Sequence, residues 1–524
     1  MTLSQQNDPF FITTTTIGII GSITTIGLIG SLIYKYPDRA IFDHIQKGIP
    51  HVKGYPLVGT FFEQVIDTEQ FYDKQHKDKL ESLNTMTMIN SAIGIPLTIT
   101  TIDPNNVQHI LTTNFPNYVK GPLVEHFLQR LFGHGIFVAD GEKWHYQRKI
   151  TSRIFNVVNF RDIFTRIFVG KLEITTKQVL DQHAFNRTPL DIQDLLFKFT
   201  LDSFVQIGFG KNLNTVTHKG IVPFAESFDI CQRHCNDLFL NPFTPIIQVF
   251  HTLLHPRTKS INDHYKRVDQ FAYDVIAQRR KDIKKGQTFN DLLSYFMKAK
   301  NEKQVAVNDI ELRDMILNLI IAGRDTTACT LSWTLYMLML HPRIEYKLLE
   351  EIDRFLPRKA EEEENSMDPS ELYKVVKDMI YCHAVLYEVL RLYPPVPSNV
   401  KMALDDDIWP DGSHIRKGNM IVWSSYAQAR SAKVWGEDCQ KFKPERWITM
   451  DGQLRHESQG KWPVFNGGPR VCIGQSLATL EAIIVMITLI RRYKFSLLPN
   501  QTIEYFMSLT MPIKNGLKVF VENR

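Results

Sequence analysis

The sequence predicts a mainly α-helical protein with a small β region, preceded by one membrane-spanning helix. Long apolar stretches with helical spacing occupy residues 315–339 and 477–490, and residues 160–300 form a series of helical patterns with Phe-rich faces. Residues 86–102 are instead rich in Thr and Ile, which favours strands. A further stretch, residues 10–34, contains no charged side chain.

The composition fits an ordinary globular chain and argues against several classes of protein. With 524 residues, 44% hydrophobic and 22% charged, the chain can bury a large core. The formal net charge of +5 is mild, and no block of Lys and Arg indicates nucleic-acid binding. Six cysteines without a disulfide spacing favour a reducing compartment. Cys231 and Cys235 flank His234, but no second ligand pair completes a zinc site, so we expect helix packing there.

The N-terminal stretch, residues 10–34, is long enough to cross a bilayer as a helix. Asp8 precedes it, whereas Lys35 and Arg39 follow, so the positive-inside rule places the main body on the cytoplasmic side. A cleaved signal peptide is the less favoured alternative, because positive charge in front of the stretch is lacking. Residues 49–59 are dense in Pro and Gly, which predicts a stiff linker. The expected organisation is a tail (1–9), an anchor (10–34), a linker with a proline-rich hinge (35–60) and a main domain (61–524).

One cysteine stands out because it lies in a glycine-rich loop directly before a helical pattern. Gly467 and Gly468 precede Cys472, and Gly474 follows it. Glycines let a backbone turn and press close to a flat ligand, and the positive end of a following helix favours a thiolate. Arg470 adds a cation to the same loop. The pattern suits a soft anionic ligand for a metal, such as a thiolate on haem iron. The alternative is a small buried hydrophobic side chain.

Polar side chains interrupt the apolar pattern over residues 315–339. Residues 322–327, Ala-Gly-Arg-Asp-Thr-Thr, place an acid and two hydroxyls inside the helix, against local propensity. A Thr hydroxyl there can bond the carbonyl one turn earlier and bend the helix, which opens a groove. An unpaired polar group in a buried helix costs free energy, so we expect these residues to have a function.

Two other helical patterns carry charged residues at helical spacing. Trp144 and Arg148 lie four apart within residues 142–155 and therefore share one helix face. Glu388 and Arg391 lie three apart, directly before a proline run, and can form a charge-assisted pair. Taken alone, each pattern is also common on ordinary amphipathic helices.

Two β features are predicted in the C-terminal part. Residues 408–425 contain a turn at Lys417 and Gly418 between strand-like runs, which predicts a β-hairpin. Residues 505–512 form an apolar loop between two further strand-like runs.

The cysteine loop resembles that of one known family. Its defining positions are all present: Phe465, Gly468, Arg470, Cys472 and Gly474. They match the haem-binding loop of the cytochrome P-450 superfamily, and a pattern of five positions is specific. The chain therefore resembles a haem-thiolate monooxygenase of the microsomal type.

The resemblance covers residues 48–524 and implies the cytochrome P-450 fold, mainly α with a small β region. It places haem b between the helices at residues 315–339 and 477–490. Cys472 is then the axial ligand of the iron, and its thiolate pushes electron density that favours O–O cleavage. With the anchor, the resemblance implies a single-pass protein of the endoplasmic reticulum membrane whose catalytic domain faces the cytosol. The segment at residues 505–512 is expected at the pocket mouth.

The other site residues are implied by the same resemblance. Asp325 and Thr326 occupy the proton-delivery positions, and Glu388, Arg391 and Arg446 would form a buried network that locks the loop around the haem. The expected cofactor-binding side chains besides Cys472 are Phe465, Arg470, Trp144, Arg148 and Lys401, of which the last three approach a haem propionate.

The implied reaction inserts one oxygen atom from O2 into a C–H bond. Electrons would come from NADPH through a separate membrane-bound NADPH–cytochrome P-450 reductase, because the chain has no flavin or nicotinamide motif. Cytochrome b5 is a second candidate donor. Lys143, Lys149 and Arg153 make one helix basic and could steer an acidic donor, although a solvated charged face is the simpler interpretation.

The substrate is inferred from finer motifs. Residues 322–328 and 331–333 look like those of the fatty-acid and alkane ω-hydroxylases of fungi and plants, and residues 115–122 and 135–141 support the same branch. The expected substrate is a long-chain fatty acid, hydroxylated at or near its methyl end. Three alternatives remain: a monooxygenase of sterols or secondary metabolites, a haem-thiolate isomerase or dehydratase, and a non-catalytic membrane protein that binds lipid or haem.

Overall fold

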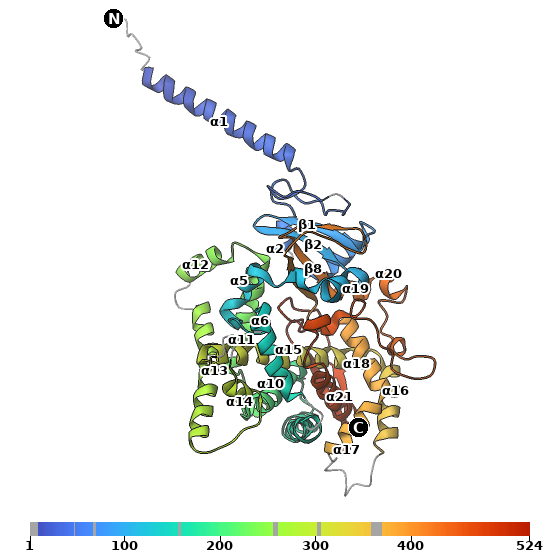
Figure 1. Cartoon of the computed structure of the whole chain (residues 1–524). Helices are drawn as coiled ribbons and strands as arrows, with labels where there is room; N and C mark the ends of the chain where they lie inside the picture. The colour runs from blue at the N-terminus through green and yellow to red at the C-terminus, as the bar shows by residue number, and fades with distance from the viewer. Residues whose placement is uncertain are drawn as a thin grey trace, which may run out of the picture.

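The computed structural model describes residues 9–46, 48–65, 70–155, 159–254, 260–300, 305–357 and 369–524. Helices form most of the body, and a mixed β-sheet lies at the end from which α1 projects (Figure 1). The first helices along the chain are α1 (Pro9–Lys35), α2 (Phe61–Val65), α3 (Phe71–Lys74), α4 (Pro104–Gln108), α5 (Gly121–Phe132), α6 (Gly141–Thr151), α8 (Thr165–Thr175), α9 (Asp181–Asn186), α10 (Ile192–Phe209), α11 (Pro223–Leu240) and α12 (Thr244–Leu254). They are followed by α13 (Ile261–Lys284), α14 (Leu292–Lys298), α15 (Asp309–Leu340), α16 (Pro342–Phe355), α17 (Pro369–Asp378), α18 (Ile380–Leu392), α19 (Ser425–Arg430), α20 (Ala432–Trp435) and α21 (Gln475–Arg492).

Helix α15 is the central element of the helical body. It starts at a capping box, in which Asn308 and Glu311 each bond the backbone N–H of the other and so satisfy free N–H groups of the first turn. The helix then runs without a break from Asp309 to Leu340, and it packs against α10, α13, α18 and α21. The polar segment at residues 322–327 therefore lies inside one continuous helix, where the sequence pattern places it. Most side chains of α15 are buried, as an apolar helix with no solvated face requires.

The main sheet joins strands from distant parts of the chain in the order β1-β2-β8-β5-β3. The pairs are antiparallel except for β2 and β8, which run parallel. The strands are β1 (Thr87–Ala92), β2 (Ile95–Thr101), β3 (Tyr118–Val119), β5 (Ser398–Ala403) and β8 (Met420–Ser424). A second sheet contains β4 (Leu190–Asp191), β10 (Lys518–Asn523) and β9 (Tyr493–Leu497), and a third pairs β6 (Asp407–Ile408) with β7 (His414–Ile415).

The predicted β region over residues 86–102 is present, whereas the predicted hairpin over residues 408–425 is only partly correct. Strands β6 and β7 form a short hairpin, but β8 leaves it and pairs with β2 and β5. All five residues of β8 are buried, so this strand is stable in the middle of a larger sheet rather than at the edge of a two-stranded one.

The Pro- and Gly-rich segment at residues 49–59 packs on the sheet instead of lying free. Val52 donates its N–H to the carbonyl of Ile89, and Ile89 donates to that of Pro50. Gly59 has φ +63°, and a Cβ there would lie 2.0 Å from the carbonyl oxygen of Ser91. Only glycine allows this close approach of two backbones.

Helix α1 projects from the body beside the sheet (Figure 1). The side chains of residues 10–19 and of Gly21, which belong to the predicted anchor, lie outside the described residues. Among the described residues, no helix is both long enough and apolar enough to cross a membrane, so the predicted transmembrane helix is not shown.

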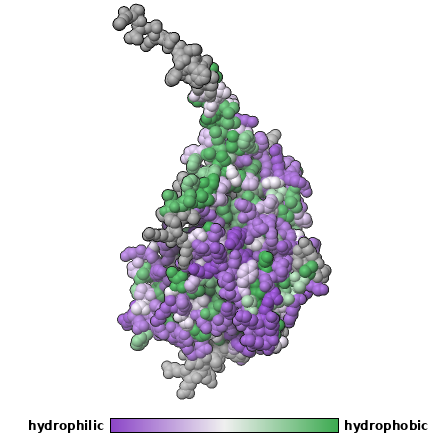
Figure 2. Space-filling view, turned by 90° about the vertical axis from the view of Figure 1, so that its left-hand side faces the viewer, coloured by the Kyte–Doolittle hydropathy of each residue, from purple (hydrophilic) through white to green (hydrophobic). Residues whose placement is uncertain are grey.

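An apolar surface lies on and beside α12, on the side of the molecule that Figure 2 shows. We call it the α12 patch. Its exposed side chains are Phe243, Ile246, Ile247, Val249, Phe250, Leu253 and Leu254. The ring of Phe243 contacts that of Phe61 at 5.7 Å between centroids, which connects the patch to α2.

Candidate active site

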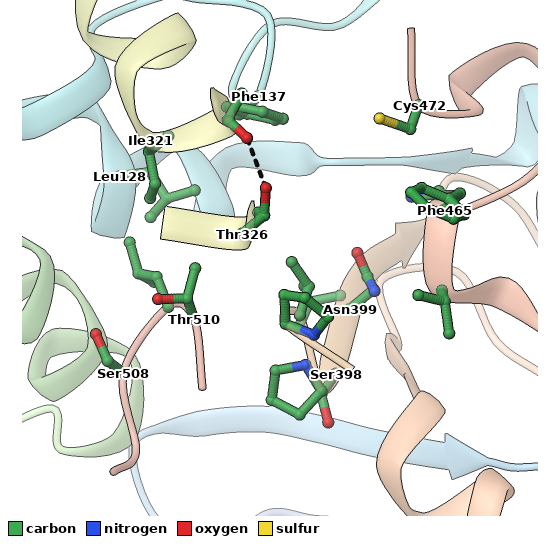
Figure 3. Close-up of a pocket in the computed structure, with 18 of the residues that line it drawn as sticks. Leu128, Phe137, Ile321, Thr326, Ser398, Asn399, Phe465, Cys472, Ser508 and Thr510 are labelled. Carbon is green, nitrogen blue, oxygen red and sulfur yellow. Dashed lines mark hydrogen bonds between the residues drawn. The ribbon is translucent and has the colours of Figure 1, made fainter. Parts of the chain in front are cut away.

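A cavity of about 520 Å³ opens between the cysteine loop and α15 (Figure 3). Its walls come from α5, α11 and α15, from the start of α21, from β5 and from residues 507–510. Of the apolar loop at residues 505–512, which was expected at the pocket mouth, residues 507–510 line the cavity. Cys472 and Thr326 face this space from two elements far apart in the sequence.

The cysteine loop presents the Cys472 side chain to the cavity. Of the six cysteines, all in the described part of the chain, Cys472 is the one whose side chain is exposed, and it is exposed to the cavity within the protein. The backbone N–H of Cys472 donates to the carbonyl of Phe465 at 2.8 Å, which closes the loop. Gly468 has φ +56°, and a Cβ there would lie 2.0 Å from the carbonyl oxygen of Leu111. Burial raises the pKa of the Cys472 thiol, whereas the N–H of Gly474 and the charge of Arg148 lower it.

Two arginines stack around Trp144 beside the cysteine loop. The guanidinium carbons of Arg470 and Arg148 lie 4.5 Å and 5.8 Å from the centre of the Trp144 ring. Arg148 donates to the carbonyl of Val471 at 2.8 Å, and Arg470 donates to the carboxylate of Asp140 at 2.6 Å. The predicted Trp144–Arg148 face therefore lies directly behind the cysteine loop.

Two lysines, Lys401 and Lys120, add basic side chains beside the same carboxylate, that of Asp140. Lys401 is 1% exposed and donates to the carbonyl of Tyr118 at 2.8 Å. Burial and the charges of Arg470 and Lys120 lower the pKa of Lys401 to about 6. Burial and Arg470 likewise lower the pKa of Lys120 to about 8, and Asp140 opposes the effect. We call Arg148, Arg470, Lys401 and Lys120 the cation cluster.

The cation cluster and Cys472 together fit haem b. Among the described residues, the Nε of Arg470 is buried and has no hydrogen-bond partner, and Asp140 is the carboxylate that faces the cluster. Burying unpaired charge is costly, so the cluster calls for an anionic ligand. The carboxylates of a haem would supply this charge beside a thiol suited to its iron. Sequence reasoning missed Lys120, because a lysine ahead of Gly and Pro carries no local signal of burial.

Thr326 and Asp325 are neighbours on α15 but have different surroundings. The Thr326 hydroxyl donates to the carbonyl of Ala322 at 2.6 Å, as the sequence predicts, and lines the cavity (Figure 3). Asp325 is 2% exposed, and its carboxylate accepts hydrogen bonds from Gln232 at 2.7 Å and Arg324 at 3.1 Å. In the part of the chain that the structure describes, Asp325 is not among the residues that line the cavity.

Glu388, Arg391 and Arg446 come together as expected. Arg391 donates twice to Glu388 at 2.8 Å, and both side chains are fully buried. Arg446 lies 3.5 Å from the same carboxylate, and the indole of Trp447 donates to it at 2.9 Å. The Trp447 ring contacts Trp462, which in turn contacts Phe465 of the cysteine loop. We call Glu388, Arg391 and Arg446 the Glu388 network.

Cys231 and Cys235 are buried in the hydrophobic core, and His234 forms a hydrogen bond with the hydroxyl of Tyr265 at 2.8 Å. These contacts accord with the packing role that the sequence predicts. Within the described ranges, no group of three or more His, Cys, Asp or Glu side chains is placed to hold a metal ion.

Comparison with known proteins identifies the family. The model of the cytochrome P450 family matches residues 50–519. Cytochrome P450 704B1 of Arabidopsis thaliana is 33% identical over 513 residues, which cover 90% of this chain and 94% of that protein. Cytochrome P450 86B1 of the same plant is 35% identical over 431 residues, or 81% of this chain and 77% of that protein.

Two further comparisons concern the fold and the diversity of relatives. The crystal structure of the cytochrome P450DA heme domain has a TM-score of 0.75 at 21% identity and covers 91% of this chain and 98% of that chain. Noroxomaritidine synthase of Narcissus aff. pseudonarcissus is 34% identical over 436 residues, or 81% of this chain and 82% of that protein. The fold, the cysteine loop and these similarities agree, and the chain belongs to the cytochrome P450 family, monooxygenases whose cofactor is haem b held by a cysteine thiolate.

Proposed function

We propose that this monooxygenase hydroxylates a long-chain fatty acid at or near its methyl end, with Cys472 as the iron ligand. The observation that carries the assignment is that Cys472 and Thr326 face one largely apolar cavity. Bound haem b supplies the iron at which O2 is reduced. Two electrons and two protons are consumed, one oxygen atom enters the C–H bond, and the other leaves as water.

The side chains of the site each have a part in this scheme. The Cys472 thiolate would hold the iron and would donate electron density to it. Arg148, Arg470 and Lys401, with Lys120, would hold the haem carboxylates by charge-assisted hydrogen bonds. Phe465 covers the cysteine loop at the cavity wall.

Protons reach the oxygen site along α15. The Thr326 hydroxyl is anchored on the carbonyl of Ala322, so its oxygen lone pairs face the cavity and can accept a proton-donating partner. Asp325 is the adjacent acid. Burial raises its pKa to about 6, against the opposing charge of Arg324, which allows it to hold and release a proton near neutral pH.

The lining of the cavity supports a lipid-like substrate. Phe127, Leu128, Phe239, Leu240 and Leu319 contribute apolar wall on the side of α5, α11 and α15. Such a lining binds an alkyl chain through buried apolar area. The motif at residues 322–328 supports the fatty-acid branch in particular.

A second candidate is the same chemistry on a secondary metabolite. Noroxomaritidine synthase, named for a different kind of product, is as similar to this chain as the other relatives are. Because pocket shape selects the substrate, similarity at this level supports the reaction more strongly than the substrate.

The proposed electron donor is NADPH–cytochrome P-450 reductase, with cytochrome b5 as a second donor, at the endoplasmic reticulum membrane. Lys149 and Arg153 are exposed at the end of the α6 segment, close in sequence to Arg148 behind the cysteine loop, and they suit an acidic partner. The charge-free sequence of residues 10–34 and the α12 patch support contact with lipid.

The deciding experiment titrates the purified holoenzyme with lauric, palmitic and oleic acids and, separately, with a sterol. We expect the fatty acids to shift the haem iron toward high spin, because they displace water from the cavity. Product analysis with NADPH and reductase then distinguishes terminal from sub-terminal alcohols. A shift with the sterol alone would reject the fatty-acid assignment and retain the monooxygenase.

A further inference from the structure

Two segments that are far apart in the sequence form adjoining walls of the cavity. Tyr72 and its neighbours in α3 line one wall. Residues 507–510 line the other, and they form the tip of a hairpin over residues 504–514, which we call the terminal hairpin. Ser508 and Thr510 of this tip lie at the cavity in Figure 3.

The second arm of the terminal hairpin is fixed to the helical body. The side-chain amide of Gln193 on α10 exchanges two hydrogen bonds with the backbone of Ile513, both at 2.8 Å. The indole of Trp333 on α15 donates to the carbonyl of Met511 at 2.9 Å. These contacts hold the hairpin beyond its tip, so the position of the tip relative to α3 depends on the first arm.

Tyr505 joins the first arm of the hairpin to α3. Its hydroxyl accepts from the backbone N–H of Tyr72 at 3.1 Å and also forms a hydrogen bond with the side chain of Asp73. The hydroxyl of Tyr426 on α19 donates to the Asp73 carboxylate at 2.8 Å. The three tyrosine rings pack together with centroids 5.5–5.6 Å apart, and none is more than 8% exposed. We call Tyr72, Asp73, Tyr426 and Tyr505 the tyrosine joint.

The electrostatics of the tyrosine joint keep its hydroxyl groups protonated. Burial and the charge of Asp73 raise the pKa of Tyr505. Burial also raises the pKa of Tyr426, where the charge of Arg430 opposes the effect and that of Asp73 adds to it. Both hydroxyls therefore remain donors, and one carboxylate accepts from both. A buried network of this kind, with its polar groups paired, fixes the geometry of the segments that it links.

We propose that the tyrosine joint determines which carbon of the substrate is oxidised, because it fixes the gap between α3 and the tip of the terminal hairpin. The proposal rests on the proposed function, since it concerns the regiochemistry of fatty-acid hydroxylation. Asp73, Tyr426 and Tyr505 are positioning residues, because they act through the two walls and do not themselves line the cavity among the described residues.

The chemistry of an alkyl chain makes this gap important. Secondary C–H bonds are weaker than the primary C–H bonds of the terminal methyl group, so an unrestrained chain is oxidised mainly at sub-terminal carbons. Oxidation of the methyl group requires walls that hold the chain in one path. A displacement of about 1 Å from the reactive geometry can change a rate a hundredfold, so a small shift of one wall is enough to change the product.

The first test measures hydrogen exchange in the holoenzyme without substrate, which does not depend on turnover. Tyr505→Phe removes the acceptor of the Tyr72 N–H and keeps the packing of the rings. We expect amides in residues 71–76 and 504–514 to exchange about two- to tenfold faster, the range that one hydrogen bond can change an opening equilibrium. Unchanged exchange in both segments would overturn the proposal, because the joint would then not hold the two walls together.

The second test measures the ratio of sub-terminal to terminal alcohols formed from palmitic acid with NADPH and reductase. Tyr505→Phe should raise this ratio about two- to tenfold, for the same energetic reason. Asp73→Ala removes the acceptor that Tyr426 and Tyr505 share, so it should change the ratio in the same direction. A variant that is only less stable loses total product but keeps the ratio, which separates a positioning role from a structural one.

Tyr493→Phe is the matched control, since it also removes a buried tyrosine hydroxyl that donates to a carboxylate, that of Asp181 at 2.5 Å. Tyr493 lies in β9 and is not among the described residues that line the cavity, so this variant should keep the wild-type ratio. If Tyr505→Phe gives the same ratio as the control, or a lower one, the role of the joint is rejected while the proposed function stands. If the wild type forms no alcohol from palmitic acid, the proposed function itself fails, and the regiochemical proposal fails with it.

Discussion

The cation cluster and the Glu388 network both bury several charges near the cysteine loop, but only the Glu388 network is balanced. In the Glu388 network, the Glu388 carboxylate accepts hydrogen bonds from Arg391, Arg446 and Trp447. Arg446 also forms a salt bridge with the carboxylate of Asp438, at 2.9 Å between nitrogen and oxygen. Among the described residues, one carboxylate, that of Asp140, lies beside the four basic side chains of the cation cluster, where it pairs with Arg470 and acts on Lys120 and Lys401.

This difference separates a structural role from a ligand site. A balanced buried network is satisfied by the protein itself and fixes the geometry of the chain. In an unbalanced one, burial and, to a lesser extent, the neighbouring positive charges lower the pKa of the lysines, as in Lys401 and Lys120, and an external anion would oppose both effects. We propose that the imbalance marks where the haem carboxylates would bind, and four variants or conditions can test the distinction.

The comparison between the cation cluster and the Glu388 network loses its basis if Cys472 is not the iron ligand. We expect Cys472→Ser to abolish NADPH-dependent product formation, because a neutral hydroxyl does not replace a thiolate on iron. The absorption spectrum of the reduced carbon monoxide complex checks the ligation directly. Cys439→Ser provides a control at a buried cysteine outside the cavity lining among the described residues, and it should keep the thiolate spectrum.

The largest loss of stability should follow disruption of the balanced network. Arg391→Met leaves Glu388 buried without its main partner, and we expect a cost of about 3–5 kcal/mol in the free energy of unfolding. The denaturation midpoint of the holoenzyme measures this. Lys347→Met, which breaks an exposed pair with Glu445, should cost about 1 kcal/mol or less. Similar shifts for both variants would contradict the structural role of the network.

A smaller but diagnostic effect is expected at Lys401. Lys401→Met removes one buried cation from the cluster, and the haem loses a charge-assisted hydrogen bond of about 1.5–3 kcal/mol. Haem transfer to an excess of apomyoglobin should therefore become about 10- to 100-fold faster. Lys417→Met, an exposed lysine on the same sheet region, should leave the transfer rate unchanged. If Lys401→Met does not speed haem loss, the cluster is not the carboxylate site.

The smallest expected effect is a pH dependence that changes with haem. Without an anionic partner, Lys401 has a folded-state pKa of about 6, below its unfolded value, so the unfolded chain binds more protons above about pH 6. The stability of the haem-free protein should accordingly rise as pH increases from about 6 toward 10. Haem carboxylates keep the lysine charged and flatten this slope. Thermal melts of both forms over that range, with Lys401→Met as the reference, check the sign.

The sequence by itself determined the family, the cysteine loop and the long helices around it, because these depend on local patterns. The spacing of Phe465, Gly468, Arg470, Cys472 and Gly474 predicts the loop, and helical spacing predicts the Trp144–Arg148 face and the Glu388–Arg391 pair. The hydrogen bond from Thr326 to Ala322 likewise links residues one turn apart.

The tertiary structure alone decided what depends on partners distant in the chain. It placed β8 between β2 and β5, and it brought Lys120 beside Lys401 with too few carboxylates. It also turned Asp325 toward Gln232, nearly a hundred residues earlier, rather than toward the cavity beside Thr326. Charge balance and burial are sums over all neighbours in space, and a local sequence pattern contains only the neighbours along the chain.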